Sequence, residues 1–263
     1  GGSIEKYHSD NVFFSRSNSV YVYNSLNDFY ADANGYLANR TRTTSPVVLN
    51  RFQVQYPNIP GQEEPLQQLD AWYVGGYAQD QWRVKTNLTL TAGVRVDTPI
   101  FKNTAYSNAQ VDNLTFRDGE GNPVKYSSGQ LPEAKPLWSP RVGFNWDVMS
   151  DQTTQVRGGT GVFTGKPAYV WISNQIGNTG VLTGQIADSN VTTRPFNPSA
   201  TAYWVTGVSG APASSFELDV TTQDFSFPQT WRSNIAVDRM LPLGMVVTGE
   251  FLFSRDVNGI YYI

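Results

Sequence analysis

The spacing of its strand-like segments constrains this chain more than any other feature of the sequence. Segments in which apolar and polar side chains alternate are predicted to be strands, at about 4–16, 70–84, 87–98, 138–149, 153–164, 228–240 and 244–256. The links between these strands alternate strictly between tight ones at 84–87, 149–153 and 241–244 and long ones at 17–69, 98–137 and 165–227. The pattern predicts antiparallel hairpins, with tight turns at one end of a sheet and long loops at the other.

The strand at 87–98 shows the alternation most clearly. Leu88, Leu90 and Val94 fall on one face and Thr91 and Arg95 on the other, because side chains alternate across a strand. Each predicted strand reaches the roughly 9–11 residues that a tilted strand needs to cross a bilayer. Loops longer than about 12–15 residues are uncommon in compact domains, whereas outer-membrane barrels combine long extracellular loops with short periplasmic turns. The sequence therefore predicts an all-β fold, an antiparallel transmembrane β-barrel.

The two faces of such a wall have different surroundings. The apolar face is expected to meet lipid through Leu88, Leu90, Val94, Phe144, Trp146, Val247 and Phe251. The polar face is expected to line a wet lumen through Arg95, Arg141, Asp147, Arg157, Arg232, Asp238 and Glu250. These charges can steer a substrate, pair with one another across strands, or pair with a plug inside the barrel, and plug contacts are the favoured interpretation.

Composition narrows the functional classes. The chain has no cysteine and one histidine, which excludes disulfides, cysteine-based zinc sites and cysteine nucleophiles. A net charge of -3 argues against a nucleic-acid-binding domain. No run approaches the roughly 18 apolar residues of a membrane helix, and no signal peptide opens the chain. Abundant Tyr, Phe, Trp, Gly and Pro suit an all-β protein, but composition alone separates neither sandwich nor propeller from barrel.

Seven spanning strands is an odd number, and bacterial single-chain barrels carry an even number. An open edge cannot face hydrocarbon, because its unpaired backbone groups cost several kcal/mol each. We therefore expect residues 1–263 to be one partial barrel domain, with further strands, a plug and any N-terminal domains outside this stretch.

A family resemblance agrees with this pattern. The hairpin YAQDQWRVKTNLTLTAGVRVD at 77–97 resembles a hairpin of TonB-dependent outer-membrane receptors. Five further stretches resemble the Oar-like branch, large receptors with a carboxypeptidase-regulatory-like domain. They are HSDNVFFSRS (8–17), YNSLNDFYADANGYL (23–37), LWSPRVGFNWDV (137–148), QVRGGTGVFTGKPAYVWISNQIGNTG (155–180) and FPQTWRSNIAVDRMLPLGMVVTGEFLFSRDVNGIYY (227–262).

The resemblance implies a 22-stranded barrel with an internal plug in the outer membrane of a Gram-negative bacterium. It also implies transport of a large or scarce substrate, energised through TonB, with neither enzymatic activity nor a cofactor. The expected partners are outer-membrane lipid, the plug domain of the same full-length protein, the TonB complex through a region outside this chain, and further outer-membrane or surface proteins.

The long loops carry the candidate ligand contacts. Tyr169, Trp171 and Asn174 stand near the base of the third long loop, and Tyr203 and Trp204 lie further along it. Exposed loop aromatics can bind sugars or peptides, but they also pack loops or sit in an interfacial girdle, and the structural interpretation is favoured. A short helix is predicted within 23–37, behind the helix-capping residues Asn24 and Ser25, and is expected to pack on neighbouring loops.

Three other motifs have ordinary structural explanations. His8 has no second histidine with which to bind a metal. The acidic loop 118–122 has oxygen ligands for calcium but lacks EF-hand spacing, so a turn is favoured and calcium binding stays open. The glycines at 158–161 lack the lysine and the following helix of a phosphate-binding loop, and glycines in barrel strands mark bends or close contacts.

Two other functional classes remain compatible with the sequence. One is a soluble β-sandwich or propeller that binds glycans through its loop aromatics, and the other is a β-rich glycoside hydrolase with an acid pair. Both place Leu90, Val94, Phe251 and their neighbours in a buried core, whereas the barrel exposes them.

Overall fold

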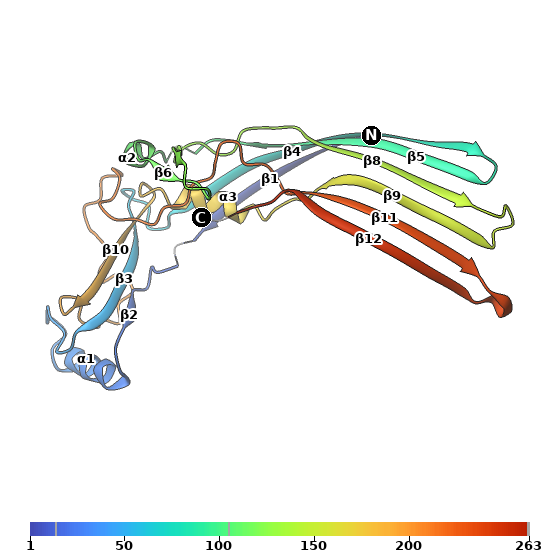
Figure 1. The fold of residues 1–263 in the computed structure, drawn as a ribbon. Coiled ribbons are helices and arrows are strands. Elements are labelled where there is room, and N and C mark those ends of the chain that lie inside the picture. The colour runs from blue at the N-terminus through green and yellow to red at the C-terminus, as the bar shows by residue number, and fades with distance from the viewer. Residues whose placement is uncertain (14, 105, 262–263) are drawn as a thin grey trace.

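Seven antiparallel strands form the main sheet of the computed structural model, which describes residues 1–13, 15–104 and 106–261. In spatial order they are β1 (Gly2–Val12), β4 (Leu66–Lys85), β5 (Leu88–Phe101), β8 (Leu137–Asp147), β9 (Thr154–Thr164), β11 (Gln229–Met240) and β12 (Val246–Asn258). The sheet curls into an open half-barrel, with β1 and β12 at its edges (Figure 1).

The strand ends differ from the sequence-based bounds mainly at the loop end of the sheet. β4 begins at Leu66, four residues before the predicted start, because Leu69 and Ala71 are buried under loop residues. The strand predicted at 4–16 runs from Gly2 to Val12, and residue 14 of that prediction lies outside the described residues. Beyond it the chain leaves the main sheet, and the Arg16 carbonyl accepts a hydrogen bond from the Gln55 amide (3.1 Å).

Tight turns join the strands at one end of the sheet, at 86–87, 148–153 and 241–245 (Figure 1). The last turn contains the short 3-10 helix η1 (Pro242–Gly244). Leu243 and Gly244 both have positive φ there, 68° and 75°, so the chain reverses through two left-handed residues. The sheet therefore has one compact end and one end from which the long loops emerge.

The first and third long loops fold together into a second sheet. β2 (Val20–Val22) and β3 (Leu49–Pro57) come from the first loop, and β10 (Thr183–Val191) from the third. They pair antiparallel in the order β10-β3-β2 and, with helix α1 (Leu26–Ala38), form the lobe farthest from the tight turns (Figure 1). We call this unit the distal lobe.

Helix α1 confirms the helix predicted within 23–37. Its N-cap is Ser25, whose side-chain oxygen accepts a hydrogen bond from the Asp28 amide (3.1 Å). This bond satisfies one of the backbone donors that the first helical turn leaves without a partner. The cap therefore fixes where the helix begins.

The remaining loop elements are short. The second loop holds α2 (Ala109–Asp112) and the hairpin of β6 (Phe116–Arg117) and β7 (Pro123–Val124), and the third loop holds α3 (Val170–Gly177). Among the described residues, no helix is long and apolar enough to cross a membrane.

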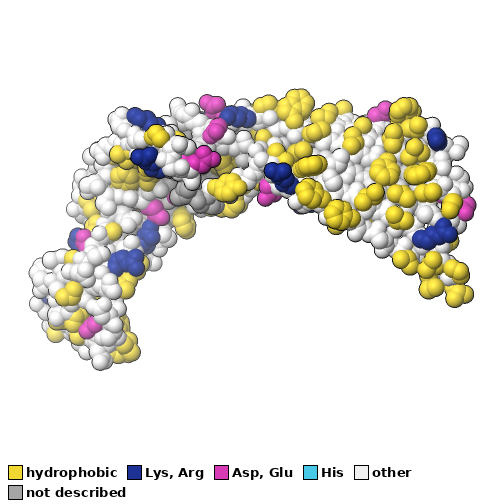
Figure 2. Space-filling view, in the orientation of Figure 1, with side chains coloured by type: hydrophobic (Ala, Val, Ile, Leu, Met, Phe, Trp, Pro, Cys, Tyr) yellow, Lys and Arg dark blue, Asp and Glu magenta, His cyan; other side chains and the backbone are white. Residues whose placement is uncertain are grey.

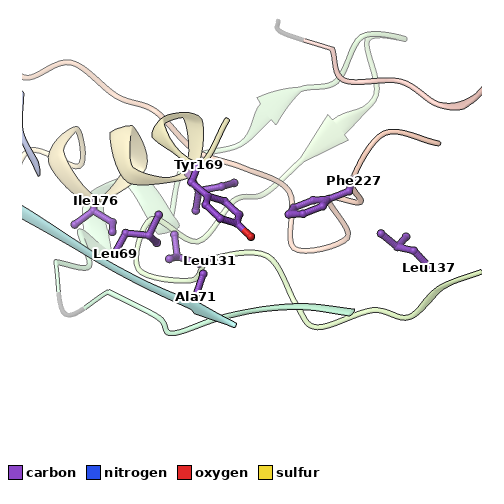
Figure 3. Close-up of a cluster of buried hydrophobic side chains, with 8 residues drawn as sticks. Leu69, Ala71, Leu131, Leu137, Tyr169, Ile176 and Phe227 are labelled. Carbon is purple, nitrogen blue, oxygen red and sulfur yellow. The ribbon is translucent and has the colours of Figure 1, made fainter. Parts of the chain in front are cut away.

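Two hydrophobic clusters hold the loops in place. The larger joins α3 to the loop end of β4 and is drawn in Figure 3, with members Leu69, Ala71, Leu131, Leu137, Tyr169, Ile172, Ile176 and Phe227. The smaller is the centre of the distal lobe, where Leu49, Phe52 and Val54 of β3 are fully buried. The buried core thus lies among the loops, and the strands toward the tight turns form a wall one sheet thick.

Candidate functional site

Residues paired directly across neighbouring strands point to the same side of a sheet, so the register defines its two faces. Trp82 of β4 lies opposite Leu90 of β5, which lies opposite Phe144 of β8. The same face continues through Gly158 of β9 to Ile235 and Phe251 at the far edge. We call this the apolar face.

Several apolar-face residues distinguish a barrel, which exposes them, from a soluble protein, which buries them in its core. No part of the described protein packs against most of these residues. Leu90, Val94, Trp146, Val247 and Phe251 are exposed, up to 66 % for Phe251. Leu88 and Phe144 are half-buried by strand neighbours. In the space-filling view, hydrophobic side chains spread over the strands toward the turn end (Figure 2). A sandwich or propeller would bury these side chains, so the wall is suited to lipid instead.

Tryptophans border this face at both ends. Trp72, Trp138 and Trp231 lie toward the loops, Trp82 and Trp146 lie toward the tight turns, and all five are exposed. Trp72 and Trp82 are ten residues apart on β4, or about 33 Å along a strand at about 3.3 Å per residue. At a strand tilt of about 40° this separation spans roughly 25 Å, the height of the apolar band of an outer-membrane barrel.

The opposite face is polar. It carries Arg95, Arg141, Asp147, Arg157, Arg232, Asp238 and Glu250, as the register shows. Both recesses in the wall of the sheet are lined mainly by side chains of this face, which places it on the concave side of the curl. We call it the inner face.

Most inner-face charges have partners. Arg95 Nη2 lies 2.7 Å from Asp97 Oδ1, and Arg157 Nε lies 2.9 Å from Asp238 Oδ2. The amide nitrogen of Asn234 donates to Glu250 Oε1 (3.0 Å). Asp147, beside a tight turn, accepts from the Gln152 amide through Oδ2 (2.9 Å). Arg157, Asp238 and Glu250 are thus held across strands, whereas Arg95 pairs along its own strand and Asp147 binds a turn amide.

The third loop folds back onto the inner face at the loop end. Tyr169 and Ile172 pack with Leu69, Ala71 and Tyr73, all of which point to the inner side of β4. In Figure 3, Ile176 lies beside Leu69, and the Tyr169 ring extends from the α3 region toward the space between Ala71 and Phe227. Helix α3 thus covers the mouth of the half-barrel.

An ion pair reinforces this contact. Lys166 Nζ lies 2.6 Å from Glu5 Oε1, and the same ammonium sits 4.9 Å from the centre of the Tyr73 ring and 5.5 Å from that of Tyr169. The contacts with Glu5 and Tyr73 join the start of the third loop to β1 and β4, and the contact with Tyr169 lies within the loop.

The family comparison agrees with this geometry. The family model for the outer membrane beta barrel domain matches residues 1–261. The chain belongs to the outer membrane beta-barrel domain family. It is therefore an outer-membrane protein of a Gram-negative bacterium. No curated protein and no solved structure matches the chain.

The loop residues singled out from the sequence fall in two separate places on this barrel domain. On α3, Tyr169 is buried in the mouth cluster, Trp171 is exposed, and Asn174 is half-buried, with no hydrogen bond to its buried Oδ1. In the distal lobe, Tyr203 packs its ring 4.9 Å from that of Phe52.

Tyr203 and its neighbour have their polar groups occupied. The Tyr203 hydroxyl donates to the Pro195 carbonyl (2.5 Å), and burial raises the pKa of Tyr203 to about 12. Trp204 donates from its indole nitrogen to the Ser17 carbonyl (3.0 Å). The structure therefore does not bring the five residues into one site, and Tyr169 and Tyr203 serve mainly to pack the loops.

The distal lobe contains a buried charge that was not predicted from the sequence. Asp32 has no exposed surface and accepts from the Tyr23 hydroxyl (2.7 Å) and the Phe196 amide (2.9 Å). Its Oδ1 lies 2.6 Å from the Arg42 guanidinium. A signal existed, since Asp32 follows Phe29 by three residues on the apolar side of a predicted helix, where a charge needs a partner.

The remaining motifs of the barrel domain are structural. His8 Nδ1 lies 2.8 Å from Asp70 Oδ1. Asp118 Oδ1 accepts from the amides of Glu120 (2.9 Å) and Asn122 (2.8 Å), and these backbone hydrogen bonds, Asn122's above all, lower the pKa of the Asp118 carboxyl. Its oxygens thus stabilise the hairpin turn between β6 and β7. Within the described ranges, no three His, Asp or Glu side chains are placed to hold a metal ion.

The glycine run lies inside β9. A Cβ on Gly158 would lie 2.8 Å from the Asn234 carbonyl oxygen, and one on Gly161 would lie 2.9 Å from Arg141 Cβ. These glycines let neighbouring strands and side chains approach closely, as expected from the strand interpretation of this run.

Proposed function

We propose that this chain forms part of the wall and mouth of a TonB-dependent outer-membrane receptor of the Oar-like branch. Its function would be to take part in moving a large or scarce substrate across the outer membrane. The support comes from the resemblance of the 77–97 hairpin and the five other stretches, together with membership in the outer-membrane barrel family. In this proposal the chain is a transport protein without catalytic activity.

The observation that carries the proposal is the folded layer above the mouth. Three loops emerge from one end of the wall, two of them join in a shared sheet through β3 and β10, and α3 packs on the inner face. A layer of this kind offers a capture surface for a solute too large or too scarce for simple diffusion. Captured substrate would then enter the lumen past α3.

The proposed partners are compatible with the same geometry. The strand edges at β1 and β12 have no neighbour within the described part of the chain, and an unpaired edge in hydrocarbon is costly, so closure needs further strands. A 22-stranded barrel encloses a lumen that needs a plug, held here in part by inner-face side chains. Energy would come from the TonB complex, acting through a region outside this stretch. Outer-membrane lipid surrounds the wall, and surface proteins are candidates for contact with the distal lobe.

The decisive experiment compares solute accumulation in three strains. They are the parent strain, a strain that lacks the gene for this protein, and a strain that lacks TonB. A panel of large solutes, such as oligosaccharides, peptides and metal chelates, is supplied at low concentration and measured in washed cells. We expect that any solute whose uptake requires this protein is also not taken up by the strain that lacks TonB. Returning the intact gene to the first deletion strain should restore uptake of that solute.

A passive barrel, which needs no energy from TonB, would give a different uptake result. Uptake that depends on this protein but persists without TonB would identify a passive pore and overturn the proposal. Unchanged uptake of the whole panel in the first deletion strain, with the protein present at normal levels in the parent, would favour a surface-scaffold role.

A further inference from the structure

Two inner-face arginines have no charged partner. The guanidinium groups of Arg141 (β8) and Arg232 (β11) form no ion pair and no hydrogen bond with any residue that the structure describes, whereas Arg95 and Arg157 on the same face are each paired with an aspartate. The carboxylate closest to Arg232 in register is Asp256, opposite Thr230, and it accepts from the Thr230 hydroxyl (3.3 Å). Further along the wall, Asp238 holds Arg157 and Glu250 accepts from Asn234. Within the described sheet, the two guanidiniums are therefore left without a counter-ion in contact.

The register sets the two arginines side by side. Arg141 lies opposite Gly161 of β9, and Gly161 lies opposite Arg232. Neighbouring strands are about 4.8 Å apart, so the two Cα atoms are separated by roughly 10 Å across a residue without a side chain. Arg141 is further positioned by Phe163, whose ring centre lies 5.3 Å from its guanidinium carbon.

Glycines make the wall hollow beside this pair. In the adjacent row Gly143 lies opposite Gly159, and both point to the inner face. These two glycines line a recess of about 370 Å³, whose lining also includes both arginines, Phe163 and Leu252. A second recess of about 220 Å³ borders Arg141 on its other side. The pocket thus combines two cations with an apolar border.

We infer that Arg141 and Arg232 form an anion-binding site on the wall of the lumen, for a small carboxylate that carries an aromatic or aliphatic group. A guanidinium presents paired N–H donors that match the two oxygens of a carboxylate, and two of them around one glycine can hold a single anionic group. Phe163 and Leu252 would cover the apolar part of the ligand. The two positive charges select an anion, and the glycines that line the recess leave space for it.

The site depends on the barrel wall alone and not on energy coupling. A protein that does not bind the anion could still be a TonB-dependent transporter. Conversely, uptake that does not need TonB would not contradict the anion site. Each can therefore be judged separately.

Benzoate is a suitable probe, with benzamide as the uncharged control of the same shape. The full-length protein, purified in detergent, is titrated with each compound by ligand-observed NMR. We expect saturable binding of benzoate, weaker binding of benzamide, and loss of about tenfold or more in benzoate affinity in the Arg141→Gln, Arg232→Gln double variant. Arg83→Gln is the matched control, because Arg83 lies on the inner face outside the recess, and its benzoate affinity should equal that of the wild type.

Heat-modifiable migration of each variant checks that the barrel is folded, and the single variant Arg232→Gln provides a second test should the double variant misfold. Equal benzoate affinity in the wild type and either arginine variant would overturn the site. Absence of benzoate binding to the wild type would also overturn it.

Discussion

Asp32 Oδ1 and the Arg42 guanidinium lie 2.6 Å apart in the distal lobe, where the Asp32 side chain has no exposed surface. The pair joins helix α1 to the segment that follows it. Through the Phe196 amide, the same carboxylate also binds the third loop, 164 residues further along the chain. One buried charge thus links the first long loop to the third, although the two loops are far apart in the sequence.

Asp32→Ala should loosen the distal lobe. Removing one partner of a buried pair costs about 3–5 kcal/mol, because the Arg42 charge is left buried without its counter-ion. We expect faster protease cleavage within 20–60 and 183–204, with unchanged heat-modifiable migration of the barrel. Asp28→Asn on the same helix is the control and should be cleaved at the wild-type rate. Equal cleavage of Asp32→Ala and wild type would show that other contacts hold the lobe.

The distal lobe should also open at alkaline pH. Burial, aided by the Asp32 carboxylate, raises the pKa of Tyr23, and burial raises that of Tyr203 to about 12. Both phenols are neutral in the folded lobe, while an exposed tyrosine ionises near pH 10. Their contribution to stability is therefore complete below about pH 10 and is lost as the pH rises from there toward 12.

The measurement is absorbance of tyrosinate during an alkaline titration, with protease cleavage of the lobe followed in parallel. Late-titrating tyrosines should ionise as cleavage begins, and Tyr203→Phe should remove one of them. Ionisation of every tyrosine near pH 10 without any cleavage would contradict the assignment.

The membrane part of this fold was predictable because the bilayer imposes a simple rule on the sequence. One apolar and one polar face per strand produce a period of two, so the hairpins built on Leu88–Val94 and Val142–Trp146 are evident from the residues alone. The loops obey no such rule. β3 pairs with β10 across more than 120 residues, and neither strand was anticipated, because nothing local indicates such a distant partner.

Helix α3 shows the same limit. Val170, Ile172 and Ile176 are β-branched and disfavour a helix, so the local sequence gives only a weak helical signal. The helix is instead stabilised by packing against Leu69 and Phe227. A structural role for Tyr169 and Tyr203 was the favoured prediction, but their packing partners were not predictable from the sequence, because they depend on which loops meet.

Val94→Arg tests the orientation of the wall. Val94 lies on the apolar face between the two tryptophan bands, and an arginine facing lipid near the midplane costs about 2–4 kcal/mol. Gln79→Arg, one register position away on the inner face, is the matched control and should change the unfolding free energy little. Urea unfolding in lipid vesicles measures both, and a Val94→Cys variant should react with a lipid-phase probe. Equal destabilisation by the two arginines, with no reaction of the cysteine, would place Val94 away from lipid.

Ile172→Ala tests whether packing holds α3 over the mouth. Ile172 is 1 % exposed, and removing a buried isoleucine side chain to alanine costs about 2–5 kcal/mol. Gln175 also holds the helix, through hydrogen bonds to the Ser128 and Gln130 carbonyls (3.1 and 2.9 Å), so we expect the segment 165–180 to loosen on the inner face while the strands stay paired. Hydrogen exchange should show faster exchange in α3 alone, and Val170→Ala, an exposed position on the same helix, should leave exchange unchanged. Exchange in α3 that matches the wild type would show that the Lys166–Glu5 pair and the Phe227 contact suffice to hold the helix in place.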